Sequence, residues 1–422
     1  MRPPPAHRAT TAHLQAVYPF VSGGGLGGAG PLVGRDLLGG SFSFDPWDLY
    51  RRGALTNPNL IVLGQLGRGK SAFVKTYVWR QVAFGRQAWI VDPKGEYGAL
   101  ASACGAAPVK IAPGGGVRLN PLELPGGAPA EPGRAGGGGR CDLLCSLVAS
   151  SLGRRVTPQE RTAIDLAVRA VSRRPHPTLP DVVAALLDPD PGLAASVRSA
   201  AADVARDGRA VALEMRHLVE GDLAGMFDGP TSTGLDVDAP AVVLDLSAVF
   251  SSPSLALLMA CCTSWMQSVL AVSPGRKRLV VVDEAWAILH DLGTARWMQS
   301  VFKLSRAYGV SNVAVVHRLS DLRAAGAEGS VQQRLAEGLL ADSETRVVFG
   351  QSPSEAGATA ELLDLTGVER DLVARLPRGV ALWKVGGRSF LVEHGVAPGE
   401  APLVDTDSAM RDAGPAAGAA AP

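Results

Sequence analysis

The sequence predicts an α/β protein built around a mainly parallel β-sheet. Short apolar segments bounded by Gly, Pro, Asn or Asp recur along the chain, and such segments are typical of buried strands. Most of them alternate with segments whose apolar residues have helical spacing, which is the order from which parallel sheets are built. A stretch near residues 140–230 that shows helical patterns alone divides this alternation into two parts.

The first strand–helix–strand unit lies near the start of the predicted core. The apolar run 60–63 follows an Asn-Pro-Asn sequence and ends at Gly64. Residues 70–84 carry apolar side chains at helical spacing, and a second apolar run, 88–91, ends at an Asp-Pro pair. We therefore expect two neighbouring parallel strands joined by one helix.

The middle of the chain predicts a flexible loop followed by an all-helical insertion. More than half of the residues in 112–139 are Gly or Pro, which favours a loop without regular structure. Thr157 and Glu160 then form a capping box, with Pro158 at the first helical position. Helical patterns continue from there to about Phe227.

Strand patterns return after the insertion. Four apolar runs predict further buried strands: 241–246, 279–282, 313–316 and 347–349. A C-terminal β-hairpin is predicted by two strand-like runs on either side of a Gly-Gly turn, 380–385 and 389–392. We predict disordered tails at 1–30 and 397–422. The core is in two parts, 31–111 and 231–396, and between them lie a flexible loop at 112–139 and a helical insertion at 140–230.

Composition excludes several classes of protein. The 41 Lys and Arg residues nearly balance the 40 Asp and Glu residues, so binding of nucleic acid by bulk charge is disfavoured, although a local basic channel is not. The five Cys are odd in number and have no His at ligand spacing, which disfavours a disulfide framework or a zinc site. Free thiols fit a reducing cytosol, so we expect a cytoplasmic protein. No apolar run reaches the roughly 18 residues of a membrane span, so if the protein works at a membrane, we expect a partner to hold it there.

The strongest motif is GQLGRGKS at 64–71, a match to G-x-x-x-x-G-K-[ST] between a predicted strand and a predicted helix. A Gly-rich turn arising by chance is the alternative, but the flanking elements favour a phosphate-binding loop. In that reading the Lys70 ammonium reaches the β- and γ-phosphates and the Ser71 hydroxyl binds Mg²⁺. The predicted nucleotide-binding residues are Gly64, Gln65, Leu66, Gly67, Arg68, Gly69, Lys70 and Ser71.

A second motif supplies the acidic half of such a site. The apolar run 279–282 ends in Asp283 and Glu284, of which the first suits Mg²⁺ and the second can orient and deprotonate an attacking water. Alone, this pattern also fits an exposed acidic turn. The glutamate favours enzymes that activate water, and both the guanine-reading motif of GTPases and the signature of transporter ATPases are absent. A RecA-like ATPase using ATP and Mg²⁺ remains.

Three further residues are candidates for the reaction. His317 ends the predicted strand 313–316, where RecA-like enzymes often place a polar group that senses the γ-phosphate; an ordinary His at a strand end is the alternative. Arg306 precedes that strand and can serve as an arginine finger for the nucleotide of a neighbouring subunit. Arg346 is the competing finger, and an ordinary surface Arg is the alternative for both.

These motifs, in this order, resemble the HerA/FtsK superfamily of pumping ATPases. Within it the chain is most similar to the ATPase core of the large ATPase of conjugative type IV secretion systems, in a form typical of actinobacteria. The segments that carry the resemblance are GRD at 34–36, FDP at 44–46, GQLGRGKS at 64–71, VDPKGEY at 91–97, NP at 120–121, MFDGP at 226–230, VVVDEAW at 280–286 and KLSRAYG at 303–309.

The resemblance implies a RecA-like core with a helical insertion that assembles into a hexamer and moves DNA or protein through a membrane channel at the expense of ATP. It carries the catalytic base onto Glu284 and favours Arg306 as the finger. Two departures stand out: the superfamily usually has Gln where this chain has His317, and only 63 residues precede Gly64, so we expect channel docking to involve a separate chain. A DNA translocase outside secretion and a nucleotide-gated scaffold are the alternative functions.

Overall fold

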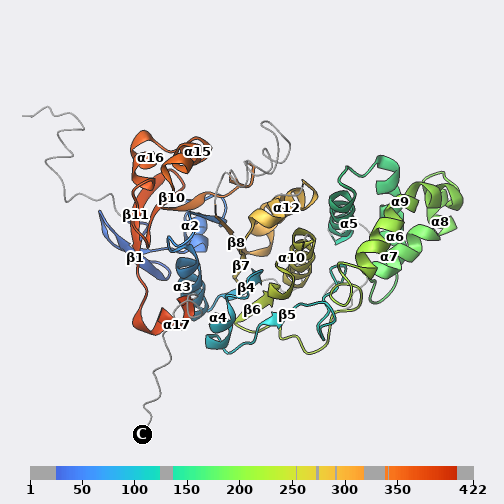
Figure 1. Cartoon of the computed structure of the whole chain (residues 1–422), viewed down its shortest axis with the longest axis horizontal. Helices are drawn as coiled ribbons and strands as arrows, with labels where there is room; N and C mark the ends of the chain where they lie inside the picture. The colour runs from blue at the N-terminus through green and yellow to red at the C-terminus, as the bar shows by residue number, and fades with distance from the viewer. Residues whose placement is uncertain are drawn as a thin grey trace, which may run out of the picture.

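The structure is a computed structural model that describes residues 25–123, 136–252, 254–271, 275–289, 292–317, 338–340 and 342–405. Figure 1 shows a sheet with its covering helices at the left and centre, and a group of helices from the middle of the chain at the right. The predicted α/β class with a helical insertion is confirmed.

Eleven strands of the described chain form a single sheet in the order β2-β1-β11-β10-β9-β3-β8-β7-β4-β6-β5. Their bounds are β1 Leu32–Asp36, β2 Gly40–Ser43, β3 Leu60–Leu63, β4 Gln87–Asp92, β5 Val109–Lys110, β6 Ala241–Asp245, β7 Arg278–Val282, β8 Val310–Val316, β9 Thr345–Phe349, β10 Val380–Val385 and β11 Arg388–His394. The seven strands from β9 to β5 run parallel, whereas β10, β11, β1 and β2 pair antiparallel. The predicted hairpin is β10–β11.

The helices connect these strands and cover both faces of the sheet. Their bounds are α2 Pro46–Arg51, α3 Lys70–Ala83, α4 Gly98–Ala103, α5 Gly136–Leu152, α6 Pro158–Val171, α7 Leu179–Leu187, α8 Pro191–Ser196, α9 Ala201–Glu220, α10 Leu255–Ala271, α11 Trp286–Leu289, α12 Leu292–Tyr308, α15 Pro353–Leu363, α16 Gly367–Val373 and α17 Ala401–Val404, with short 3-10 turns η2 Ser247–Val249 and η3 Pro398–Glu400. Helices α5 to α9 form the group at the right of Figure 1.

Both faces of the central strands are buried, which explains their unbroken apolar sequences. In β3, Leu60 and Val62 join the apolar cluster that contains α3, while Ile61 and Leu63 join the cluster that contains α10 and α12. Successive side chains of a strand point to opposite faces, so a strand covered on both sides is apolar at every position. The second cluster continues without a break into the helices α5 to α9.

The insertion begins with a helix that packs against α12. Helix α5 starts at Gly136, inside the segment predicted as a flexible loop, and residues 124–135 of that loop lie outside the described part. The predicted capping box is present at the start of α6, where Thr157 accepts from the Glu160 N–H and the Glu160 carboxylate accepts from the Thr157 N–H.

The C-terminal end departs from the predicted tail. A tail was expected from residue 397, but η3 and α17 follow there, and α17 packs against α3 and α4. Arg80 of α3 forms an ion pair with Glu400, and Leu403 is buried. The remainder of the two predicted tails, 1–24 and 406–422, lies outside the described residues. Among the helices that are described, none has the length and apolar character needed to cross a membrane.

Candidate active site

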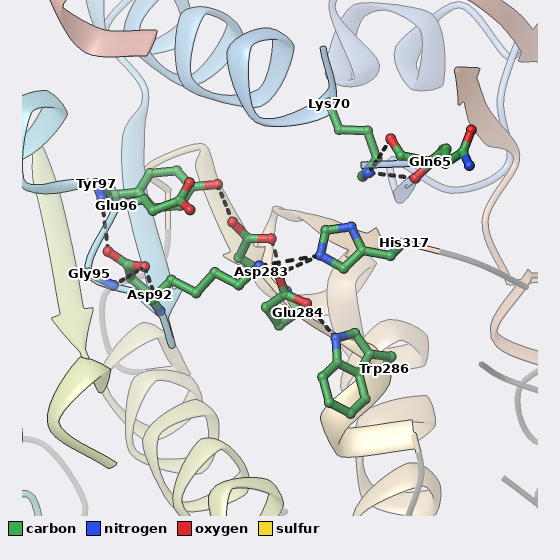
Figure 2. A network of polar contacts seen from close by, with 12 residues as sticks. Gln65, Lys70, Asp92, Gly95, Glu96, Tyr97, Asp283, Glu284, Trp286 and His317 are labelled. Carbon is green, nitrogen blue, oxygen red and sulfur yellow. Dashed lines mark hydrogen bonds and ion pairs between the residues drawn. The ribbon is translucent and has the colours of Figure 1, made fainter. Parts of the chain in front are cut away.

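The predicted site residues meet at the carboxyl edge of the parallel strands. Strand β8 lies between β3 and β7, so His317, which follows β8, stands between the phosphate loop after β3 and the acidic pair after β7. Strand β4 lies on the other side of β7 and contributes the loop 92–97. Figure 2 shows the adjacent Asp283 and Glu284 beside His317, with Lys70 of α3 on the other side of His317. Crevices at this edge are where open α/β sheets bind ligands.

The phosphate loop has a backbone that only glycine supports at its critical points. Gly69, which caps the N-terminus of α3, has a φ of 109°, and a Cβ on Gly64 would lie 2.5 Å from the Cβ of Phe349. Two backbone hydrogen bonds tether the loop to later parts of the chain. Gln65 donates to the Gly350 carbonyl at 3.2 Å, and the N–H of Gly379 donates to the carbonyl of Arg68 at 2.9 Å.

Lys70 carries a buried positive charge that has no direct partner of opposite charge. Its Nζ donates to the carbonyl oxygens of Gly64 and Gln65, the latter at 3.0 Å, and no described carboxylate forms an ion pair with it. Burial lowers the pKa of Lys70 to about 8. An anion on the loop would neutralise this charge, so the residues present fit a phosphate group.

Asp283 carries the complementary charge and forms no ion pair with any Lys, Arg or His of the described residues. Its carboxylate accepts hydrogen bonds from the Tyr97 hydroxyl at 3.0 Å and from the Glu284 N–H at 2.9 Å. Burial and the negative charge of Glu284 raise the pKa of Asp283 to about 6. A divalent cation would balance the negative charge of Asp283, and its carboxylate and the Ser71 hydroxyl are oxygen ligands of the kind that Mg²⁺ prefers.

The donors for such a cation are few. Among the described residues, no group of three or more His, Cys, Asp and Glu side chains could hold a metal ion. Mg²⁺ commonly binds through one or two carboxylates, retains several waters and shares phosphate oxygens of a substrate. The site therefore suits a cation that arrives with a nucleotide rather than one held by the protein alone.

Glu284 differs from its neighbour because several donors surround it. Its Oε1 pairs with the Lys94 ammonium and lies 2.6 Å from Nε2 of His317, and its Oε2 accepts from the indole N–H of Trp286. Burial alone would raise the pKa of Glu284, but the hydrogen bonds from His317, Lys94 and Trp286 outweigh it and hold the pKa at about 2. The Glu284 backbone has a φ of 52°, a left-handed conformation that is uncommon for non-glycine residues and that costs free energy.

The loop 92–97 is held at both ends, and its contacts were not foreseen from the sequence. The Asp92 carboxylate accepts from the N–H groups of Lys94, Gly95 and Tyr97, at 3.2, 2.9 and 2.9 Å. At its far end, Glu96 lies 3.6 Å from the buried ammonium of Lys75 on α3. The VDPKGEY motif and the rarity of lysine in this chain were the signals available for these contacts.

The two candidate arginine fingers lie outside this cluster. Arg306 is exposed in the last turn of α12, at the amino end of β8, whereas His317 follows the carboxyl end of that strand. From the rise per residue of a β-strand, the two residues lie about 20 Å apart. Arg346 instead donates to the backbone carbonyls of Leu340 and Leu363, both at 3.3 Å, and burial lowers its pKa. Arg346 is therefore occupied within its own chain.

The chain is similar in sequence to one protein family and in structure to several solved proteins. A family described as an AAA-like domain matches residues 52–111, which span β3, the phosphate loop, α3 and β4. No curated protein matches the chain at a significant level. VirB4 of Thermoanaerobacter pseudethanolicus aligns with a TM-score of 0.70 and 22% identity, over 90% of this chain and 100% of that chain. The fold is that of VirB4.

A second group of similar structures is the plasmid coupling protein TrwB. The unbound bacterial conjugative coupling protein has a TM-score of 0.54 and 16% identity, over 80% of this chain and 85% of that chain. TrwB in complex with ADP and Mg²⁺ has a TM-score of 0.55 and 16% identity, over 82% and 87%. The predicted fold, a RecA-like P-loop core with a helical insertion, is thus confirmed.

Proposed function

We propose that this protein is a Mg²⁺-dependent ATPase that couples ATP hydrolysis to the transfer of a macromolecule, DNA or protein, in conjugative DNA transfer or type IV secretion. The observation that carries the proposal is the meeting of Lys70, Asp283, Glu284 and His317 at one edge of the sheet. The likeness to VirB4 and to the coupling protein TrwB supports the transfer role, and the TrwB complex with ADP and Mg²⁺ supports the ligands.

Each residue of the site has its own role in the proposed reaction. Backbone N–H groups of the loop 64–71 and the Lys70 ammonium bind the phosphates, and Ser71 with Asp283 would hold Mg²⁺. When bound, the cation supplies positive charge that stabilises the transferring phosphoryl group. Glu284 orients the attacking water and accepts its proton. Because the Glu284 carboxylate can only accept, we assign a proton to Nε2 of His317, which lies 2.6 Å from Oε1 of Glu284.

We further propose that the active site is shared between subunits of a ring, with six subunits as the expected number. Arg306 is exposed at the edge of the sheet opposite the site of its own chain, so it is suited to the site of a neighbour. Membrane channel proteins are the expected partners, and recruitment by them would hold a cytoplasmic protein at the membrane.

Replacement of Lys70 by Ala tests the ATPase directly. Because the ammonium neutralises phosphate charge during the reaction, we expect kcat to fall by at least about 100-fold and transfer to be lost. The measurement is phosphate release with and without DNA, beside plasmid transfer in cells. Lys110→Ala, which changes an exposed lysine at the far edge of the sheet, is the matched control.

Two results would count against this proposal. Wild-type protein that hydrolyses no ATP at any concentration, with Mg²⁺ present, would exclude an ATPase. Intact plasmid transfer with Lys70→Ala would remove the link to secretion, and stimulation by DNA without a transfer phenotype would favour a DNA translocase of another kind.

A further inference from the structure

The carboxylate of Glu284 is held from three directions. A carboxylate has two oxygens with about four acceptor positions, and three donors occupy Oε1 and Oε2 of Glu284. The donors come from three separate parts of the chain: the loop after β4, the residue that follows β8 and the start of α11. Such an arrangement fixes the carboxylate more tightly than its own side-chain torsions do and leaves room for one further donor, such as a water molecule.

We propose that Lys94 is a positioning residue for ATP hydrolysis, acting through the Glu284 carboxylate. The inference rests on the proposed ATPase function and adds to it a residue from the VDPKGEY loop. The Lys94 ammonium is a full positive charge paired with Glu284, and charged hydrogen bonds are the stronger kind. Together with the 2.6 Å contact from His317, its ammonium therefore constrains the orientation of the carboxylate.

Hydrogen bonds and side-chain contacts at both ends fix the loop that carries Lys94. Asp92 accepts three backbone N–H groups of the loop, and Tyr97 at the other end donates to Asp283. The Lys75 ammonium, buried in α3, lies 5.4 Å from the centre of the Tyr97 ring and pairs with Glu96. The backbone from which Lys94 extends is thus anchored both to the magnesium carboxylate and to the helix of the phosphate loop.

Lys94 and Lys70, the lysine of the phosphate loop, have different partners. Lys70 donates to carbonyls of its own loop, whereas Lys94 pairs with Glu284 and lies 3.5 Å from Nε2 of His317. The Lys94 side chain is 30% exposed, so it adds little to the packing of the core, and the buried Glu284 carboxylate keeps the contacts with His317 and Trp286 when the ammonium is removed. A defect in a Lys94 variant should therefore appear in catalysis rather than in folding.

The test is a double-mutant cycle on ATP hydrolysis, with Lys94→Met, Glu284→Gln and the two combined. If Lys94 acts through Glu284, Lys94→Met lowers kcat by roughly 10- to 100-fold, leaves KM and the affinity for ADP unchanged, and causes no further loss in the Glu284→Gln protein. Lys94→Arg should restore part of kcat because it keeps the charge. Lys110→Met is the matched control, and thermal unfolding checks that each variant is folded.

The outcomes separate the two proposals. Unchanged kcat in Lys94→Met overturns the inference. Weakened nucleotide binding together with a loss that multiplies with that of Glu284→Gln also overturns it, because Lys94 would then contact the phosphates directly. Wild-type protein that binds ATP without hydrolysing it contradicts the proposed function itself, whatever the variants do.

Discussion

At the scale of single residues, two adjacent carboxylates of this protein have opposite environments. Asp283 has a pKa raised to about 6 by burial and by its neighbour, while hydrogen bonds overcome burial and hold the pKa of Glu284 at about 2. Neighbouring groups whose pKa values are driven apart commonly have different roles in a reaction. Here the carboxylate without a cationic partner is the one that suits Mg²⁺.

Tyr97 offers a test of this division. The Tyr97 hydroxyl donates to Asp283 and holds its orientation, so Tyr97→Phe should weaken the binding of Mg²⁺. We expect the Mg²⁺ concentration for half-maximal ATPase activity to rise by about 10-fold or more. Tyr50→Phe, at an exposed tyrosine, is the control. An unchanged Mg²⁺ requirement in the Tyr97 variant would show that this hydroxyl does not support the metal site.

The sequence identified the residues of the motifs but not the contacts among them. Lys70, Asp283 and His317 follow or end recognisable strand patterns, so their meeting at one edge was predictable from α/β topology. The pairing of Lys94 with Glu284 depends on β4 lying next to β7, and the order of strands in a sheet leaves no local pattern in the sequence. The sensor role predicted for His317 stays a prediction, since its contact in this structure is with Glu284.

At the scale of elements, local capping signals and burial patterns explain what was predictable. Central strands are apolar on both faces and are visible as continuous runs, whereas β1 and β2 mix buried, half-buried and exposed residues without a continuous apolar run and escape such a search. Helix α17 has one buried residue, Leu403, in a segment of four, and so short a pattern does not distinguish it from the predicted tail. Next to α17, Glu400 pairs with Arg80 of α3, a contact between distant parts of the chain that no local pattern announces.

Helix α6 allows a pH-dependent prediction. Hydrogen bonds from Arg154, with help from the Thr157 backbone, lower the pKa of Glu160 to about 2. Because the pKa is depressed in the folded state, this stabilisation is complete above the unfolded pKa near 4.5 and is lost as the pH falls toward 2. Glu160→Gln should therefore cost about 1–2 kcal/mol of unfolding free energy at pH 7.

Denaturant unfolding across pH checks this expectation. The difference between Glu160→Gln and the wild type should shrink steadily as the pH falls below 5. Glu220→Gln, which breaks a pair with Arg216 that is more than half exposed on both sides, should change stability by less than about 0.5 kcal/mol. A difference for Glu160→Gln that stays constant with pH would mean that the carboxylate charge does not stabilise the cap.

At the scale of the whole molecule, the two ends of the parallel strands present different chemistry. The carboxyl edge holds the phosphate loop and the acidic pair, while Arg306 lies at the amino end of β8. A single chain cannot bring these together without unfolding the sheet. In a ring, by contrast, one subunit can present its amino edge to the carboxyl edge of the next.

Mixing two inactive variants tests this arrangement. Arg306→Ala keeps the phosphate loop, and Lys70→Ala keeps the arginine, so each alone should lose at least about 100-fold in kcat. Rings that contain both variants have some sites with an intact loop facing an intact arginine. We expect ATPase activity to reappear when the two proteins are mixed and to depend on their ratio. Full activity of Arg306→Ala alone, or no recovery in the mixture, would exclude a shared site built on this residue.

The strand that precedes the phosphate loop has consequences for how the protein is made. Strand β3 is released early in synthesis, yet its two partners in the sheet, β8 and β9, end at Val316 and Phe349. Until those residues leave the ribosome, β3 has neither neighbour, and the Gly350 and Gly379 contacts that steady the loop do not exist. We therefore expect nascent chains that stop before this point to carry the complete phosphate motif and still be unable to retain ATP.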